Sequence, residues 1–236
     1  MTTTKDWKSD YKSKLVTPEE AAAQVKSGDW ILLLPVNSMP MDILNALAAR
    51  KDEIEKVKIA SNLMIYPYAF LGGDYVGKIT YYSGYFGPLE RMFLSQGNVV
   101  PFPMHLSKAE LALELGKVND VAMLEVTPPD ERGYMNYGPC GVVYGRFATT
   151  TCKKVIVQVN SKTPWIHGIE NTIHVSEVDY IVEKDHDLPG VSEIPITDVE
   201  KKIGEFIAER IPDGATIQLG IGGIPNAVAY FHHEIS

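Results

Sequence analysis

The sequence is poor in cysteine and has no long apolar run. Its 236 residues include two cysteines, Cys140 and Cys152, which are too few and too badly spaced for a disulfide scaffold or a zinc site. The longest apolar runs, such as residues 31–36, fall far short of the roughly 18 residues that a membrane helix needs. We therefore expect no structural disulfide, no bound metal and no membrane-spanning helix.

Basic residues are also scarce, because 22 Lys and Arg face 30 Asp and Glu and the formal net charge is −8. This acidic balance argues against non-specific binding to nucleic acid or to an anionic membrane. Residues 1–8 contain no apolar segment of the kind that secretory signals carry. We expect a globular, cytoplasmic protein with no nucleic-acid partner and no membrane partner.

The beginning of the chain alternates helix and strand signals. Thr17-Pro-Glu-Glu20 is typical of a helix start, with Thr17 as N-cap and Glu20 closing a capping box. The helix is predicted to end at Gly28, which supplies a left-handed cap. The apolar run 31–36 predicts a buried strand of a parallel sheet, and Pro40 begins a second predicted helix.

The same alternation continues along the chain. Further strands are predicted at residues 57–60, 79–83, 121–126, 155–159 and 180–182, and helices near residues 88–96, 108–116 and 198–209. Strands and helices that alternate at these lengths predict an α/β fold, an open and mostly parallel sheet with flanking helices. Residues 134–146 are rich in Gly, Tyr and Asn, and we expect a surface loop there.

The opening pattern recurs near the end of the sequence. Residues 185–195 lack apolar periodicity and are typical of a linker. After it, Thr197-Asp-Val-Glu200 is a second capping box, Gly214 follows the helix, and residues 216–219 predict a strand before Pro225.

The spacing of the two copies is nearly the same, since Gly28 to Pro40 spans 12 positions and Gly214 to Pro225 spans 11. We predict a duplicated α/β domain, with residues 1–195 as the first copy and residues 196–236 as the beginning of a second. The second copy would stop after one strand and part of a helix, so we expect a truncated chain. Chance recurrence of a common local pattern is the alternative.

The sharpest local signal is Gly220-Ile-Gly-Gly-Ile-Pro225, between the last predicted strand and helix. Glycines let a backbone approach a ligand, and free N–H groups at a helix N-terminus favour a phosphate or an oxyanion. The segment is not a dinucleotide fingerprint, because Pro225 occupies the third-glycine position, and no Gly-Lys-Ser/Thr follows as in a P-loop. A tight turn that needs small residues for packing alone is the alternative.

A second signal follows the predicted strand 121–126, where Thr127-Pro-Pro-Asp-Glu-Arg-Gly-Tyr134 forms a loop. Ligands of open α/β sheets bind at the carboxyl ends of strands. The alternative is a rigid turn, with Asp130 as turn former and Gly133 at positive φ. His167 and His174 lie seven positions apart, and we interpret them as structural residues rather than as a metal pair.

These motifs together resemble the acetyl-CoA hydrolase/transferase family, nearest to its 4-hydroxybutyrate and butyrate:acetate CoA-transferases. The resemblance rests on residues 220–225, residues 127–134 and Ile173-His-Val-Ser-Glu-Val-Asp179, and it runs from about Trp7 to about Tyr230. It implies two similar open α/β domains and a homo-oligomer in the full-length form. It also implies acyl-CoA and a small carboxylate as substrates, with coenzyme A as a substrate rather than a resident cofactor.

The resemblance also implies a covalent mechanism through a glutamyl-CoA thioester. The Gly-rich loop of the family contacts CoA and helps to stabilise the thioester oxyanion. This role is carried over to Gly220, Ile221, Gly222, Gly223 and Ile224, and a weaker substrate-loop role to Pro128, Pro129, Asp130 and Gly133.

No catalytic residue is assigned in this chain. The family's nucleophilic glutamate lies in a His-Ser/Thr-Glu-Met motif, which the resemblance places beyond Ser236. His232-His-Glu234 resembles that motif only in part and comes too early in the chain.

We therefore expect the N-terminal part of an acyl-CoA:carboxylate CoA-transferase. An acetyl-CoA hydrolase and a non-catalytic module that binds acyl-CoA or a partner are the alternatives. A sugar-phosphate isomerase of related topology would need a general-base carboxylate beside a phosphate loop, which these motifs do not suggest.

Overall fold

The computed structural model of the chain describes residues 6–190 and 195–235, with the side chains of residues 142 and 232–235 left aside. The chain divides into two compact units. Unit 1 comprises Met1–Pro189 and unit 2 comprises Gly190–Ser236. The expected linker, residues 185–195, spans this division, and its residues 191–194 lie outside the described part.

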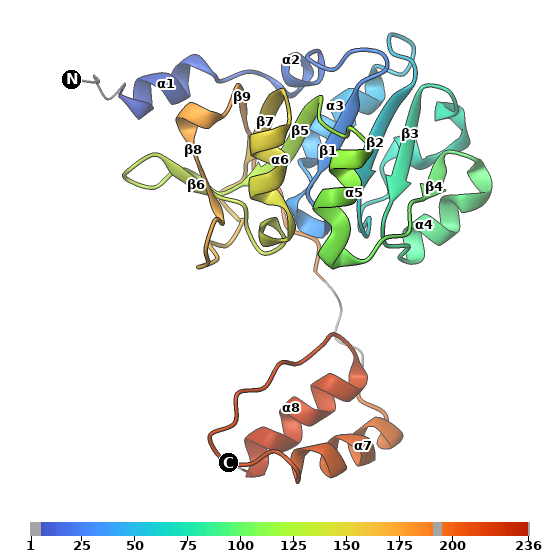
Figure 1. Cartoon of the computed structure of the whole chain (residues 1–236), viewed down its shortest axis with the longest axis vertical. Helices are drawn as coiled ribbons and strands as arrows, with labels where there is room; N and C mark the ends of the chain where they lie inside the picture. Colours follow the sequence, from blue (N-terminus) through green and yellow to red (C-terminus); the bar gives the residue numbers. More distant parts are fainter. Residues whose placement is uncertain (1–5, 191–194, 236) are drawn as a thin grey trace. The chain divides into compact units, whose positions relative to one another are not determined.

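Unit 1 is built on a seven-stranded sheet in the order β4-β3-β2-β1-β5-β7-β9, and each strand is parallel to its neighbours (Figure 1). The strands are β1 Trp30–Leu33, β2 Val57–Ser61, β3 Ile79–Ser83, β4 Val99–Pro101, β5 Val121–Val126, β7 Lys154–Val159 and β9 Tyr180–Glu183. Every strand predicted before residue 190 is present, and the α/β class is confirmed. The strand order reverses direction between β1 and β5, so the loops after these two strands leave to opposite sides.

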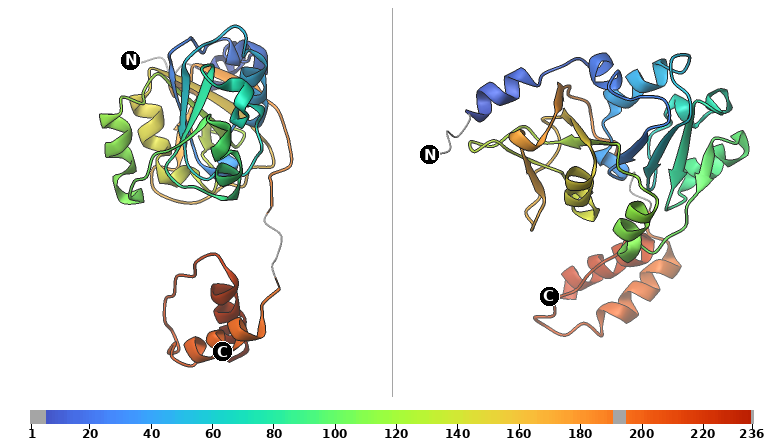
Figure 2. Two further views of the ribbon diagram at one scale, coloured as in Figure 1. Left: turned by 90° about the vertical axis from the view of Figure 1, so that its right-hand side faces the viewer. Right: turned by 45° about the horizontal axis from the view of Figure 1, so that its top comes forward.

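Helices cover both faces of this sheet. They are α1 Trp7–Ser13, α2 Pro18–Ala22, α3 Met41–Ala49, α4 Pro88–Phe93, α5 Ala109–Leu115 and α6 Gly145–Thr151, with short 3-10 helices η1 Val36–Ser38, η2 Ala69–Leu71, η3 Gly73–Tyr75, η4 Leu94–Gln96, η5 Leu106–Lys108, η6 Gly141–Val143 and η7 Val175–Glu177. The left view of Figure 2 shows the blue helices on one side of the sheet and the green and yellow α5 and α6 on the other.

This two-sided cover explains why the strands are continuous apolar runs. Alternate residues of a strand point to opposite faces, so Ile31 and Leu33 of β1 pack with α2 and α3 while Leu32 packs with α5 and α6. All six residues of β5 are buried. A strand that is covered on both faces has no solvent side, and it therefore lacks the alternation of polar residues.

The prediction of a surface loop at residues 134–146 is wrong. The segment contains β6 (Tyr134–Asn136), which pairs antiparallel with β8 (Thr172–His174), followed by η6 and the start of α6. Its glycines serve close packing around a fully buried aromatic ring: a Cβ atom at Gly145 would lie 2.8 Å from the Tyr137 ring, and one at Gly141 would overlap the same side chain.

The predicted first helix is shorter than expected, although its start is confirmed. Thr17 and Glu20 form the capping box, in which each backbone N–H donates to the other side chain at 2.8 and 3.2 Å. Helix α2 ends at Ala22, while Gly28 has the expected left-handed conformation with φ of 89°. The N–H of Gly28 donates to the Glu55 carbonyl at 2.9 Å, and this bond joins the turn at Gly28 to the loop before β2.

Unit 2 consists of two packed helices, α7 (Asp198–Ala208) and α8 (Gly223–Ile235). The second capping box, Thr197 with Glu200, is confirmed. The helices approach closely at Gly204, where a Cβ atom would lie 2.7 Å from the Cβ of Ala227. That this unit begins a second copy of the domain remains a prediction.

The predicted strand at residues 216–219 is wrong as a description of unit 2. The backbone from residue 215 to residue 220 has no strand assignment and pairs with no strand in the described part of the chain. The physical reason is that a strand needs a hydrogen-bonded neighbour, whereas the described part of unit 2 contains two helices and no strand. Ile217 and Leu219 consequently stay 39% and 43% exposed.

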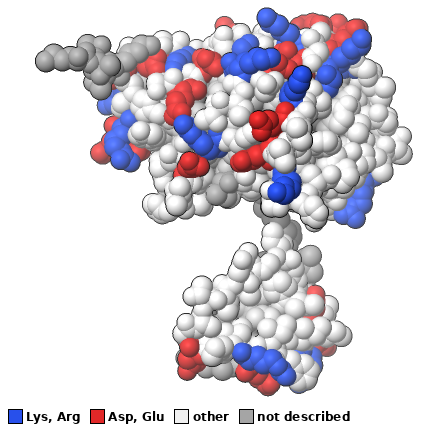
Figure 3. Space-filling view, in the orientation of Figure 1, with Lys and Arg blue, Asp and Glu red and all other residues white. Residues whose placement is uncertain are grey.

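Charged side chains of both signs lie next to one another on the face of unit 1 shown in Figure 3. The ion pairs of unit 1 include Lys153 with Asp120 at 2.7 Å and Arg146 with Glu177 at 2.6 Å. Within residues 6–190 and 195–235, no helix combines the length and the apolar character that crossing a bilayer requires.

Amide hydrogen exchange tests the contrast between the two units. We expect the Ile217–Leu219 amides to exchange close to unprotected rates, because no strand accepts from them. The β5 amides, paired on both sides, should exchange on the order of 1,000-fold more slowly or better, as core strands do at unfolding free energies of about 5 kcal/mol. Slow exchange across Ile217–Leu219 in a monomeric sample would contradict the arrangement described for unit 2.

Candidate functional site

The carboxyl ends of β1 and β2 carry two strained residues side by side in the sheet order. Val36, after β1, has φ of 58°, and Leu63, after β2, has φ of 46°. Branched residues rarely adopt the left-handed region, and each such residue costs on the order of 1–3 kcal/mol. Strain of this kind concentrates at functional sites. Val36 follows β1, which borders the reversal of strand order where ligands of open α/β sheets bind, and Leu63 follows the next strand, β2.

A small pocket lies beside these strained residues, and we call it the switch-point pocket. It is lined by Val36 and Asn37 from the loop after β1, by Tyr66 and Tyr68 from the loop after β2, and by His186. Its volume of about 10 Å³ is close to the space of one water molecule. The Oδ1 atom of Asn37 is buried and has no hydrogen-bond partner among the described residues, so it can accept a hydrogen bond from a ligand or from water.

A buried polar network lies near the end of β5 and is connected to this pocket through His186. Glu125, fully buried, accepts hydrogen bonds at Oε1 from Asn160 at 3.0 Å and from Thr163 at 2.9 Å. Its Oε2 atom lies 2.5 Å from Nε2 of His186. Burial raises the pKa of the Glu125 carboxyl, although the His186 ring and the two donors oppose that rise.

A second buried amide joins β7 to the start of α3. Gln158 accepts at Oε1 from the backbone N–H of Asp42 at 3.0 Å, and its Nε2 donates to the Asp42 carboxylate at 2.9 Å. The first N–H groups of a helix have no partner within the helix. Gln158 thus satisfies the beginning of α3 and holds it against the carboxyl ends of the strands.

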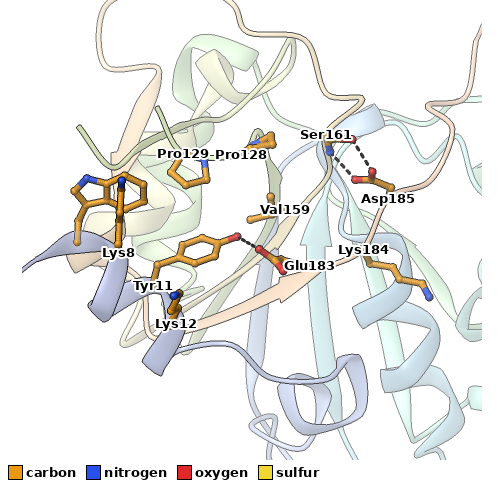
Figure 4. A pocket seen from close by; sticks show the side chains of 11 residues that line it. Lys8, Tyr11, Lys12, Pro128, Pro129, Val159, Ser161, Glu183, Lys184 and Asp185 are labelled. Atoms are coloured by element: carbon orange, nitrogen blue, oxygen red, sulfur yellow. Dashed lines mark hydrogen bonds between the residues drawn. The ribbon is translucent and has the colours of Figure 1, made fainter. Parts of the chain in front are cut away.

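A larger concavity, the β9 groove, lies at the same edge of the sheet between α1 and the ends of β5, β7 and β9 (Figure 4). Its volume of about 740 Å³ is in the range of small-molecule sites. Tyr11 of α1 donates to the Glu183 carboxylate at 2.8 Å, and Ser161 donates to Asp185 through its N–H at 2.7 Å and its hydroxyl at 2.6 Å.

The structure separates the four predicted substrate-loop residues into two pairs. Pro128 and Pro129 line the β9 groove. Asp130 instead accepts from the N–H groups of Arg132 and Tyr134, both at 2.9 Å. Asp130 therefore serves the turn, whereas the two prolines reach a cavity.

Gly133 also serves the turn, at φ of 88°. A Cβ atom there would lie 2.8 Å from the Trp7 ring and 2.9 Å from Nε2 of His174. His174 in turn lies 2.8 Å from the Ser176 hydroxyl through Nδ1, which agrees with its interpretation as a structural residue.

The Gly-rich segment differs from expectation in its boundaries. Helix α8 begins at Gly223, so Gly223 and Ile224 lie in its first turn, and no strand precedes them. The carbonyl of Gly222 accepts the first intrahelical bond, from Asn226 at 3.1 Å. The N–H groups of Gly223 and Ile224 therefore have no partner within the helix.

The glycines of this segment also differ from one another. Gly222 has φ of 144°, and its nearest neighbour is Pro225 at 3.8 Å from a built Cβ atom. Gly220 has the same open surroundings without the positive φ. At Gly223, in contrast, a Cβ atom would overlap the Glu200 carboxylate. Packing alone explains Gly223, but it does not explain Gly220 or Gly222, and the predicted CoA contact stays a prediction.

Glu234 lies in the last turn of α8, and its side chain is outside the described residues. Cys140 and Cys152 are free thiols. Among the side chains that the structure describes, no three His, Cys, Asp or Glu residues gather in a way that could hold a metal ion.

Five residues of the candidate site were missed in the sequence: Val36, Asn37, Leu63, Glu125 and His186. A signal existed for Glu125, since it is the single charged residue of the strand Val121–Val126. Asn37 also follows a predicted strand, which is a position where ligand contacts gather. The left-handed conformations of Val36 and Leu63 have no such signal, because both residue types normally avoid them.

Comparison with protein families matches residues 1–192 to the acetyl-CoA hydrolase/transferase N-terminal domain. Butyryl-CoA:acetate CoA-transferase of Anaerostipes caccae is 36% identical over 231 residues, which covers 94% of this chain and 51% of the relative. 4-Hydroxybutyrate coenzyme A transferase of Clostridium kluyveri is 34% identical over 232 residues, with 96% and 52% covered. The chain thus spans about half the length of the curated relatives that it matches.

Solved structures show the same relationship. The crystal structure of RipA from Yersinia pestis superposes with a TM-score of 0.85 at 30% identity, over 96% of this chain and 55% of that one. The match leaves nearly half of the RipA chain unmatched.

Replacement of Val36 by glycine tests the strain at the switch point. Glycine adopts positive φ freely, so we expect Val36→Gly to keep the free energy of unfolding or raise it by up to about 1 kcal/mol, in line with the usual cost of such strain. The control is Val143→Gly, also at a half-buried valine but without positive φ, which should lose about 1 kcal/mol or more of stability. Urea unfolding measures both, and equal losses would contradict the assignment of strain.

Proposed function

Because the chain belongs to the acetyl-CoA hydrolase/transferase family, we propose that it is the N-terminal part of an acyl-CoA:carboxylate CoA-transferase of the acetate, butyrate or 4-hydroxybutyrate type. The observation that carries the proposal is the identity of 34–36% to two CoA-transferases over more than nine-tenths of the chain. The substrates proposed are an acyl-CoA and a small carboxylate.

The reaction that we propose proceeds through a glutamyl-CoA thioester. A glutamate carboxylate attacks the thioester carbonyl, the C–S bond breaks, CoA departs as a thiolate, and an acyl-glutamyl anhydride remains. The thiolate then attacks the glutamyl carbonyl, which releases the acyl group as a carboxylate and leaves CoA on the glutamate. A second carboxylate takes CoA by the reverse steps. The nucleophile is not assigned to a residue of this chain.

The chain's own contribution is the stabilisation of negative charge at the thioester oxygen. In our proposal the backbone N–H groups of the Gly220–Ile224 segment, those of Gly223 and Ile224 in particular, donate to that oxygen as it becomes an oxyanion. Donors that are fixed in place before the reaction need no reorganisation when the charge develops. The partial positive charge at the N-terminus of the 13-residue helix α8 acts in the same direction.

For the substrate loop, we propose that Pro128 and Pro129 act through the β9 groove that they line. Asp130 and Gly133 then contribute indirectly, because they hold the turn in which the prolines sit. A homo-oligomer and a cytoplasmic location stay predictions.

The first test concerns turnover by these 236 residues alone. With no nucleophile assigned, we expect them to bind acyl-CoA without transferring CoA from butyryl-CoA to acetate in a steady-state assay. Water in place of acetate as acceptor checks for hydrolysis in the same assay. Transfer that is abolished by Glu234→Gln would contradict this expectation and would make Glu234 the nucleophile.

The second test concerns the Gly-rich segment in an active protein that contains it. Gly222→Val should lower turnover by roughly 100-fold, the usual loss for one oxyanion donor, because valine cannot hold a φ of 144° and the loop must shift. The fold should survive, since the space around Gly222 is open.

The matched control is Gly220→Val, at a glycine with equally open surroundings and no positive φ. If turnover depends on the positive φ at Gly222, Gly220→Val should keep most of the turnover. Thermal melts accompany both rates. A Gly222→Val protein that melts early but keeps its specific activity would reduce this segment to a packing role.

A further inference from the structure

The segment that leaves β9 contributes to both concavities at the carboxyl edge of the sheet. Glu183, Lys184 and Asp185 line the β9 groove, and His186 lines the switch-point pocket. What holds this segment in place therefore shapes both cavities at once. Within this segment, His186 is the residue whose side chain contacts the buried Glu125.

His186 is attached at three points. Its Nε2 lies 2.5 Å from Oε2 of Glu125, its Nδ1 lies 3.1 Å from the Asp187 carbonyl oxygen, and its own carbonyl accepts from Asn160 at 3.1 Å. The same Asn160 side chain donates to Glu125. Residues 61 positions apart are thus joined in one network near the carboxyl end of β5, an inner strand of the sheet.

The position of the protons follows from donors and acceptors. The Asp187 carbonyl only accepts, so Nδ1 of His186 carries a proton. Oε1 of Glu125 already accepts from Asn160 and Thr163, so a proton on this carboxyl would sit on Oε2. The contact between Oε2 and Nε2 therefore needs one proton: with none, two acceptors would face each other, and with two, two donors would.

We infer that Glu125 and His186 share a single proton as a net-neutral pair, and that Glu125 is the positioning residue that holds the β9-exit segment against the sheet. Neutrality removes the cost of burying a lone carboxylate. It also explains how an acidic residue is tolerated among the apolar side chains of β5. The inference does not depend on the function proposed above.

Groups around the pair do not supply this proton. Tyr68 faces Glu125 from the loop after β2, and its pKa is raised by burial and by the Glu125 carboxyl. Asp185 and Asp187 flank His186 in sequence, and their carboxylates are bound by Ser161 and by Lys162 at 2.6 Å in each case. The Glu125–His186 pair is therefore separate from the exposed ion pair of Lys162 with Asp187.

Glutamine distinguishes a specific hydrogen bond from simple space filling. In Glu125→Gln the amide oxygen can accept from Asn160 and Thr163 while the amide N–H donates to Nε2 of His186. Glu125→Leu has similar size but offers neither group. If the shared proton holds the segment, glutamine restores what leucine loses.

The experiment uses the 236-residue chain and two readouts. Long-range proton–nitrogen NMR of the histidine rings reports the protonated nitrogen of His186, and amide exchange reports the mobility of residues 184–188. We expect the Nδ1–H form in the original protein and in Glu125→Gln, with exchange within about threefold of each other. Glu125→Leu should keep the proton on Nδ1, which the Asp187 carbonyl accepts, but it should lose the hydrogen bond at Nε2 and exchange about tenfold faster, the effect of one lost buried hydrogen bond.

The control is Asp187→Asn, which removes the exposed ion pair with Lys162 beside the same segment and should change neither readout. If Glu125→Leu does not fold, His186→Ala removes the pair from its less buried end, where the side chain is 14% exposed, and should raise exchange equally. Exchange as slow in Glu125→Leu or His186→Ala as in the original protein would overturn the inference. Exchange as fast in Glu125→Gln as in Glu125→Leu would do so as well.

Discussion

The reversal of strand order between β1 and β5 is the constraint on which the rest of unit 1 depends. All seven strands are parallel, so their carboxyl ends meet at one edge and their connections must cross over the faces. At the reversal the two neighbouring loops diverge and leave space between them. The strained Val36, the buried Glu125 and the Asn37 oxygen that no described residue pairs with all lie at this edge.

Glycine serves two different purposes in this chain. Around Tyr137 and at the contact of α7 with α8, the neighbouring atoms leave no room for a side chain at the glycine positions, so these glycines serve packing. At Gly220 and Gly222 the surroundings are open, so packing does not require glycine there. The same residue type in the same sequence thus supports a core in one place and a predicted ligand contact in another.

Most of the fold was predictable because its signals are local. The capping boxes at Thr17 and Thr197 are four-residue patterns, and the strands of the large sheet are apolar runs. The segment 134–146 was misread because its packing depends on Tyr137 and on β8, which lies more than thirty residues away. The strand predicted at residues 216–219 failed for the opposite reason, since its sequence suits a strand but no strand lies beside it in the part of unit 2 that the structure describes.

Local patterns predicted the α/β class, the family, most helix starts and the two loops that hold the predicted contacts, but not helices α1 and α6. The tertiary structure was needed to show which of those residues reach a cavity, since Pro128 and Pro129 line the β9 groove while Asp130 and Gly133 stabilise a turn. It alone also revealed the left-handed Val36 and the pairing of Glu125 with His186. The reason is physical: strain and buried proton sharing arise from contacts between distant segments, which no local pattern records.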